Sequence, residues 1–239
     1  YVHGGAWQDG DRSQYPRFLV DRGYAVASLD FRSSKQARFP ANVHDIKAAI
    51  RFLRARAGTY GYRAARIAVA GTSSGGHLAA LVGTTTGLRE LEGEIGDARD
   101  ESSAVQAIVS WYGASNLTTI LAQSTPFGLS VREPALRLLL GDLPDQVPEL
   151  AMLASPVMHV DADDPPALLI HGNQDPQMPV NQLLELEAAY RRAGAAVETI
   201  LLDQSGHGGP EFESGEVAAR VLSFLARTIG SPGLPASGS

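Results

Sequence analysis

The 239-residue chain contains no cysteine and very little lysine. The absence of cysteine excludes disulfide bonds, thiolate catalysis and cysteine-ligated zinc. Lysine occurs only at Lys35 and Lys47, so arginine supplies nearly all of the positive charge. The formal net charge of -6 lacks the basic excess that nucleic acids and anionic membranes favour, and we expect neither as a partner.

Long apolar runs and cofactor motifs are also lacking. No stretch approaches the ~18 apolar residues of a transmembrane helix, and no signal-peptide pattern is visible. H-E-x-x-H, G-x-G-x-x-G and Walker-type patterns are absent, so we expect neither a metal nor another cofactor. The chain starts at Tyr1 without an initiator methionine, which leaves the compartment open, with the cytoplasm slightly favoured over export. The oligomeric state also stays open.

Short apolar runs alternate with helical patterns along the chain. Ile46, Ile50 and Leu53 recur at the spacing of one helix face, after a strand-like run at residues 24–30. Strands alternating with helices predict an α/β fold with a mostly parallel sheet and helices on both faces. Further strands are expected at residues 66–70, 105–112, 167–170 and 197–202, and further helices at residues 77–82, 180–192 and 216–228.

Residues 115–160 interrupt this alternation. They carry several prolines and helix-like pieces at residues 134–140 and 147–153, which is typical of either a small cap over a pocket or a surface excursion. Residues 230–239 are rich in Gly, Ser and Pro and predict a disordered tail. We expect residues 1–229 to form a single domain, as the length favours.

Residues 71–75, Gly-Thr-Ser-Ser-Gly, match the pattern G-x-S-x-G around Ser73. The pattern alone is common, but here an expected strand precedes it and an expected helix follows. A sharp turn between them exposes the serine above the sheet edge, and glycines on either side avoid steric clash. Ser73 is therefore the predicted nucleophile of a serine hydrolase, with an inert Gly/Ser turn as the alternative.

A serine hydroxyl needs a general base, and the chain offers six histidines. His207 lies just past the last expected strand, among glycines that leave its ring exposed and mobile, and is the predicted base. The other five are interpreted as structural: His3, His44, His77, His159 and His171.

Asp175 is the predicted acid that orients the histidine. It follows an expected strand on the same sheet edge as Ser73, where ligand sites of parallel sheets lie. Asp203 is the rival, but it stands on the same short loop as His207 and would struggle to reach the rear nitrogen of the imidazole. The order Ser73, Asp175, His207 is that of α/β-hydrolases.

Ester hydrolysis builds negative charge on the carbonyl oxygen, which fixed backbone N–H groups stabilise. Ser74, directly after the nucleophile, is one expected donor. The loop at residues 3–7, His-Gly-Gly-Ala-Trp, is the other expected source, because its small side chains let the backbone approach a substrate. Trp7 and Tyr112 are expected to contact that substrate.

The stretches HGGAW, GTSSGGHLA, HGNQDPQMPV and SGHGG occur in this order, together with FPANVHDIKAAIRFLRARA and VQAIVSWYGASNL. They resemble the bacterial α/β-hydrolase esterases related to hormone-sensitive lipase, in particular the BD-FAE (feruloyl-esterase-like) group, over nearly the whole chain. The resemblance implies an α/β-hydrolase fold with catalytic Ser73, Asp175 and His207. It also implies an oxyanion hole from Gly5, Ala6 and Ser74, with Gly4 as the substitute if the loop is shifted by one residue.

The chain departs from that family in two places. Ser115 and Asn116 stand where the family usually has Thr and Asp, which affects any substrate contact made there. Family members also carry further strands before the glycine loop, whereas only Tyr1 and Val2 precede it here. A missing interior strand would leave buried backbone groups unpaired, so we expect the sequence to be incomplete at its N-terminus.

The favoured function is a carboxylesterase that cleaves a small-molecule ester through an acyl-enzyme. Short acyl esters, acetylated sugars and feruloyl-type esters are all open as substrates. An amidase of the kynurenine formamidase type is the alternative enzyme, since it also uses an HGG-x-W loop. A catalytically impaired, truncated hydrolase or a binding protein on the same scaffold is the alternative from another class, because fold does not guarantee function.

Overall fold

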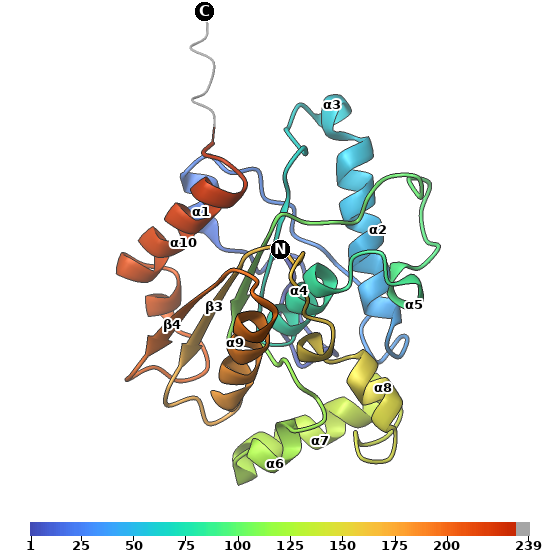
Figure 1. Cartoon of the computed structure of the whole chain (residues 1–239), viewed down its shortest axis with the longest axis vertical. Coiled ribbons are helices and arrows are strands. Elements are labelled where there is room, and N and C mark those ends of the chain that lie inside the picture. The colour runs from blue at the N-terminus through green and yellow to red at the C-terminus, as the bar shows by residue number, and fades with distance from the viewer. Residues whose placement is uncertain (233–239) are drawn as a thin grey trace, which may run out of the picture.

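Four parallel strands form the sheet of the computed structural model, which describes residues 1–232. They lie side by side in chain order (Figure 1): β1 (Ala68–Thr72), β2 (Ala107–Trp111), β3 (Ala167–Gly172) and β4 (Val197–Leu202). Helical segments connect each strand to the next, as parallel pairing requires. The predicted α/β fold with a parallel sheet is confirmed. Of the tail predicted at residues 230–239, positions 233–239 lie outside the described residues.

One face of the sheet is covered by α2 (Ala41–Ala55), α4 (Ser74–Thr84) and α9 (Asn181–Ala193). Successive side chains of a strand point to opposite faces, and Val69 and Ile108 point to this one. Every residue of α4 is buried, because this helix lies between the sheet and α2. The helix that follows the expected nucleophile is therefore fixed by packing against both the sheet and α2.

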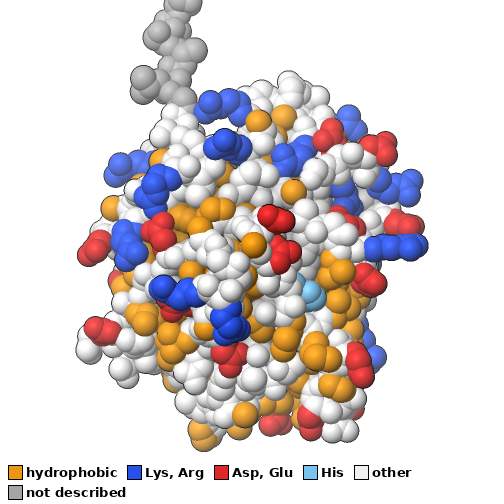
Figure 2. Space-filling view, viewed as in Figure 1, with side chains coloured by type: hydrophobic (Ala, Val, Ile, Leu, Met, Phe, Trp, Pro, Cys, Tyr) orange, Lys and Arg blue, Asp and Glu red, His pale blue; other side chains and the backbone are white. Residues whose placement is uncertain are grey.

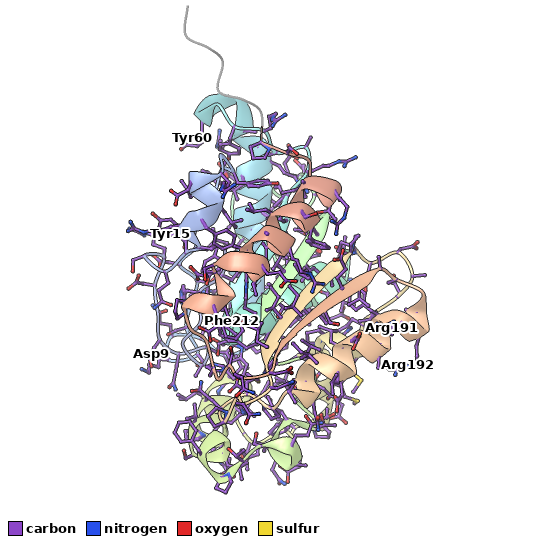
Figure 3. All side chains as sticks on the ribbon, turned by 90° about the vertical axis from the view of Figure 1, so that its left-hand side faces the viewer. Asp9, Tyr15, Tyr60, Arg191, Arg192 and Phe212 are labelled. Carbon is purple, nitrogen blue, oxygen red and sulfur yellow. The ribbon has the colours of Figure 1, made fainter. Side chains whose placement is uncertain are left out.

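The other face is covered by α1 (Arg17–Asp21) and α10 (Gly215–Thr228). Ala70 and Val109, the strand neighbours of the residues above, point to this second core. Figure 3 shows α10 crossing the sheet, with Phe212 labelled near its start. Helices thus close both faces, as the buried strands require.

The N-terminal segment lies beside β1. Val2 forms parallel bridges to Gly71 and to Leu29. The strand predicted at residues 24–30 is wrong except for Leu29, the single bridged residue of that run. Hydrogen bonds join Tyr1 to Ala27 and Leu29, and in this parallel register Val2 lies opposite Leu29. Most of the run at residues 24–28 therefore has no partner strand among the described residues.

Residues 115–160 contain three helices: α6 (Ile120–Gln123), α7 (Pro126–Leu140) and α8 (Pro148–Leu153). Figure 1 shows them together at the bottom of the view, beyond the arrowheads of β3 and β4. This is the edge at which parallel sheets carry their ligand sites. The segment is therefore placed where a cap would lie.

The helix predicted at residues 134–140 is longer than expected, since α7 begins at Pro126 and contains Pro134 in its interior. The Thr125 side chain accepts a hydrogen bond from the backbone N–H of Gly128, which caps the helix at its true start. The fixed dihedral of a proline suits the first turn of a helix, and the buried face beyond Pro134 keeps the helix continuous.

The remaining helices and strands follow the predicted pattern with small shifts. The strand predicted at residues 66–70 lies at residues 68–72, because Gly71 and Thr72 still pair with Ser110 and Trp111 of β2. The remaining short elements are α3 (Ala57–Tyr60), α5 (Arg89–Glu92) and the 3-10 turns Pro156–Met158 and Pro210–Phe212.

Charges of both signs are interspersed with apolar side chains on the face shown in Figure 2. Apolar side chains are exposed around α7 and α8; Phe127, Leu138 and Met152 are among them, each more than a third exposed. Within residues 1–232, no helix has the length and apolarity needed to cross a bilayer.

Replacing Gly75 by alanine should destabilise the fold. A Cβ atom there would lie 2.1 Å from the Val2 carbonyl oxygen and 2.4 Å from that of His3, and neither backbone group is free to move. We expect the Gly75→Ala variant to lose about 3 kcal/mol of unfolding free energy in urea titrations.

Gly58→Ala is the matched control. Gly58 is helical and its Cβ would meet nothing within 4 Å, so alanine should stabilise by up to about 1 kcal/mol through its higher helix propensity. Equal unfolding midpoints for the two variants would contradict this account of the close approach at Gly75.

Candidate active site

Ser73 occupies a strained turn between β1 and α4. Its dihedral angles are φ 53° and ψ -121°, a region that side-chain-bearing residues rarely adopt. The backbone N–H of Ser73 donates to the Trp111 carbonyl oxygen at 2.9 Å, and its own carbonyl accepts from the N–H of His77 at 3.0 Å. Strand pairing on one side and the helix on the other therefore hold the turn in place.

The glycines of the turn allow three backbone segments to meet. A Cβ at Gly71 would lie 2.3 Å from the Gly75 carbonyl oxygen and 2.7 Å from that of Val2. Any side chain at either glycine would separate the N-terminal segment from the start of α4. The G-x-S-x-G pattern thus places the glycine loop next to Ser73.

His207 lies within hydrogen-bond distance of the Ser73 hydroxyl. The distance from Ser73 Oγ to His207 Nε2 is 2.9 Å, although 134 residues separate the two in sequence. His207 stands on the loop after β4, and its ring packs against that of Tyr112 with centroids 4.8 Å apart. Tyr112 itself has a positive φ of 40° at the end of β2, which directs its ring to this spot.

Asp175 holds the far side of the imidazole. The Nδ1–H group of His207 donates to Asp175 Oδ2 at 2.6 Å, and the backbone N–H groups of Gln177 and Met178 donate to Oδ1, both at 2.8 Å. Burial alone would raise the pKa of this carboxyl, but the hydrogen bonds from His171, His207 and the backbone hold it well below its usual range. Asp175 is therefore a permanent anion.

Asp203, the alternative acid, does not pair with His207, whose Nδ1 is bound to Asp175. Its carboxylate is exposed and accepts a hydrogen bond from the Asn173 side chain at 2.6 Å. The side-chain nitrogens of five histidines contact other groups. His3 and His44 contact Gly4 and Glu90; His77, His159 and His171 contact Ala154, Leu153 and Met178.

The glycine loop presents backbone N–H groups near Ser73. Gly5, Ala6 and Trp7 all have positive φ angles, which turn the loop sharply toward α4. Within residues 1–232, the N–H groups of Ala6 and Ser74 donate no hydrogen bond to another protein group. Ala6 and Ser74 also line the same small pocket as Ser73, so both donors are available to a bound ligand.

Trp7 is anchored through its polar edge. Its side chain is 2% exposed, and its Nε1–H donates to Nδ1 of His77 at 2.9 Å. His77 in turn donates from Nε2 to the Ala154 carbonyl oxygen at 2.7 Å. This chain of two hydrogen bonds joins the glycine loop, α4 and the end of α8. Trp7 lines the pocket, and its N–H group is already paired with His77.

Ser115 and Asn116 bind α9 instead of the pocket. Both backbone N–H groups donate to the Gln182 side chain at 2.8 Å, and the Asn116 amide donates to Glu185 at 2.7 Å. Although these two residues differ from the family pattern, their polar groups are paired with α9 inside the fold.

The pocket beside Ser73 has a volume of about 240 Å³ including its open mouth. Ala6 and Trp7 line one side of it, and Val131, Arg132, Ala135, Gln177 and Met178 line the other. No motif in the sequence predicts that these five residues line the pocket. A signal was present at Arg132, because this arginine stands at the spacing of the apolar stripe Ala135, Leu136 and Leu139.

Comparisons with known proteins show what this chain is similar to. The model of the BD-FAE family matches residues 1–190. Esterase LipC of Mycobacterium tuberculosis is 33% identical over 213 residues, which is 87% of this chain and 52% of the relative. The chain thus spans about half the length of the curated relatives it matches.

Two solved structures extend the likeness to the backbone. A truncated form of a carbohydrate esterase from gut microbiota has a TM-score of 0.85 and 31% identity, covering 95% of this chain and 83% of that one. The propionate-bound esterase Est2 of the planctomycete Thermogutta terrifontis has a TM-score of 0.76 and 25% identity, covering 98% and 84%. The match to the family model ends before His207.

The buried His77 should make the stability of the fold pH-dependent. Burial lowers the pKa of His77 from 6.5 to about 4. Between these values the unfolded chain binds a proton that the folded protein does not, so the free energy of unfolding falls as the pH decreases. The contribution is about 3 kcal/mol over this range.

The measurement is urea unfolding at pH 7.0 and pH 4.5, for the wild type and for His77→Gln. The variant should be less stable at pH 7.0, because it weakens two buried hydrogen bonds, yet lose less stability on acidification. The same loss in both proteins would mean that His77 titrates normally in the folded state.

Proposed function

The chain belongs to the BD-FAE family, and on that premise we propose that it is a carboxylesterase that hydrolyses short-chain esters through an acyl-enzyme on Ser73. The observation that carries the proposal is the continuous hydrogen-bonded series from Ser73 Oγ through His207 to Asp175. A nucleophile, a base and an orienting anion in contact are what acyl transfer requires.

The proposed reaction uses His207 twice. Nε2 of His207 takes the hydroxyl proton as Ser73 Oγ attacks the ester carbonyl carbon. The protonated ring then gives this proton to the departing alcohol, and the acyl group stays on Ser73. A water molecule, deprotonated by the same nitrogen, then attacks the acyl carbon. The bond from the acyl carbon to Ser73 Oγ breaks, His207 returns the proton to Oγ, and the carboxylic acid is released. Asp175 stabilises the imidazolium formed in each half of the cycle.

The negative oxygen of each tetrahedral intermediate needs fixed donors. We assign this role to the backbone N–H groups of Ala6 and Ser74, with Gly5 as the neighbouring donor. The support is that Ala6 and Ser74 are unpartnered in residues 1–232 and line the pocket together with Ser73. The dipole of α4, whose first residue is Ser74, adds to the stabilisation of negative charge there.

We assign the pocket at Ala6, Val131 and Ala135 to the acyl chain of the substrate. The pocket is small, which favours a short acyl group. Thermogutta terrifontis Est2 has been solved with propionate and with butyrate bound. A short-chain ester is accordingly the proposed substrate, ahead of feruloyl-type esters.

The nucleophile is tested by Ser73→Ala. We expect kcat for p-nitrophenyl acetate to fall by at least about 10,000-fold, because within residues 1–232 no other hydroxyl forms a hydrogen bond with His207. A fluorophosphonate probe should label the wild type and leave this variant unlabelled. Ser223→Ala, which removes an exposed serine of α10, is the control and should be labelled as strongly as the wild type. Labelling of Ser73→Ala at the wild-type rate would refute the assignment.

The acyl pocket is tested by chain length. On p-nitrophenyl esters, kcat/KM should be highest between acetate and butyrate, and N-formylkynurenine should be a poor substrate by comparison. Val131→Ala widens the pocket, so we expect the hexanoate-to-butyrate ratio to rise by about fourfold, the value of one buried methylene. An unchanged ratio would place the acyl chain elsewhere, and faster turnover of N-formylkynurenine would favour the amidase.

A further inference from the structure

Arg132 is a buried arginine in the wall of the pocket beside Ser73. Its side chain is 3% exposed, and its helix α7 presents it on the same stripe as Ala135 and Leu139. Buried arginines normally pair with an acid, because an uncompensated buried charge is costly. Arg51, which is as buried as Arg132, follows this rule and pairs with Glu92 at 3.2 Å.

Arg132 has no such partner among the residues that the structure describes. Its Nε and Nη2 atoms lack any hydrogen-bond partner among residues 1–232, and Nη1 contacts only the Met178 sulfur at 3.5 Å. A thioether is a weak acceptor and leaves most of the guanidinium unsatisfied. Two donors of a planar fork are thus left without an acceptor in a wall of the pocket.

Asp175 contributes charge to this region without satisfying Arg132. Its Oδ1 accepts from the backbone N–H groups of Gln177 and Met178, and its Oδ2 accepts from His207. Burial lowers the pKa of Arg132 to about 10, while the negative charge of Asp175 acts in the opposite direction. Arg132 is therefore a cation near neutral pH, held beside the anion that His207 needs.

We infer that Arg132 binds a second carboxylate on the acyl chain, so that the preferred substrates are monoesters of short dicarboxylic acids. This inference rests on the proposed esterase function. A carboxylate accepts two parallel hydrogen bonds from a guanidinium, which matches the two unpartnered donors. The small pocket allows only a short spacer between the two carbonyl carbons.

The reaction is ordinary hydrolysis with a charged acyl group. The ester bond breaks, water supplies the hydroxyl and the proton, and the products are an alcohol and a dicarboxylate. Arg132 transfers no proton; it holds the far carboxylate so that the ester carbonyl lies at Ser73 Oγ. The free energy of this contact is available before and during the reaction, so it acts mainly on KM.

The experiment compares esters that differ only at the far end of the acyl chain. Monomethyl succinate and monomethyl glutarate carry the carboxylate, methyl 4-methylpentanoate is an apolar isostere of the succinate ester, and methyl 4-oxopentanoate offers a neutral acceptor. Acid release is followed in a pH-stat at pH 7.5. For the wild type we expect kcat/KM of the better dicarboxylic monoester to exceed that of the isostere by about 10- to 100-fold.

Three variants separate charge from shape. In Arg132→Met the ratio of charged to apolar ester should fall to about one or below, and in Arg132→Lys it should be intermediate, because lysine lacks the bidentate fork. Arg137→Met is the matched control, since Arg137 lies on the same helix, is about half exposed and pairs with Asp142. It should keep the wild-type ratio.

A binding measurement tests the inference without turnover. Succinate or glutarate should raise the thermal unfolding midpoint of the wild type and of Arg137→Met, butyrate should raise it less, and Arg132→Met should show no preference for the diacids. This readout decides the matter even if Arg132→Met is unstable, because the wild type alone gives the preference for diacid over butyrate.

Failure of this inference and failure of the proposed function give different results. Turnover of the neutral esters without any preference for the charged ones, and equal stabilisation by succinate and butyrate, would overturn the role of Arg132. Equal preference for methyl 4-oxopentanoate would also overturn it, in favour of a neutral acceptor. No turnover of any ester would overturn the esterase itself, while diacid binding would still report on Arg132.

Discussion

The close passage of the N-terminal segment across the turn at Ser73 is the constraint on which the rest of the site depends. The carbonyl oxygen of Val2 lies where a side chain at Gly71 or Gly75 would have to be, so only glycine permits the contact. The contact brings the glycine loop, with its N–H groups, to the side of a serine that is itself held at φ 53°. Strain at Ser73 is tolerated because strand pairing and the fully buried α4 leave the turn no alternative.

The two buried charged groups near the pocket, Asp175 and Arg132, differ in how well their hydrogen bonds are satisfied. Asp175 has both carboxylate oxygens satisfied, whereas Arg132 has a weak sulfur contact and two donors without partners in the described part of the chain. The hydrogen bonds of Asp175 are therefore made within the folded protein, whereas we propose that those of Arg132 are made by a bound ligand. Together with the series from Trp7 through His77 to the end of α8, this couples residues 115–160 to the pocket at two points.

Much of the fold followed from the sequence, because its strands and helices differ in periodicity. The run at residues 197–202 lies at its predicted bounds, and α9 and α10 lie within one residue of theirs. The strand predicted at residues 24–30 failed for a physical reason. Its apolar pattern is that of a strand, but a ladder also needs a partner of equal length, and the parallel register with Val2 opposite Leu29 leaves most of the run without one among the described residues.

The sequence by itself determined the chemistry available to this protein: a serine between glycines, a histidine and an aspartate in α/β-hydrolase order, and a glycine loop before them. Each lies in a short motif, and a short motif can be recognised from the sequence alone. Only the tertiary structure decided which atoms meet. The 2.9 Å between Ser73 and His207, and the lack of a partner for Arg132 among residues 1–232, arise from elements far apart in the chain. Such contacts depend on how the sheet, α4 and α7 pack together, and no spacing along the sequence records them.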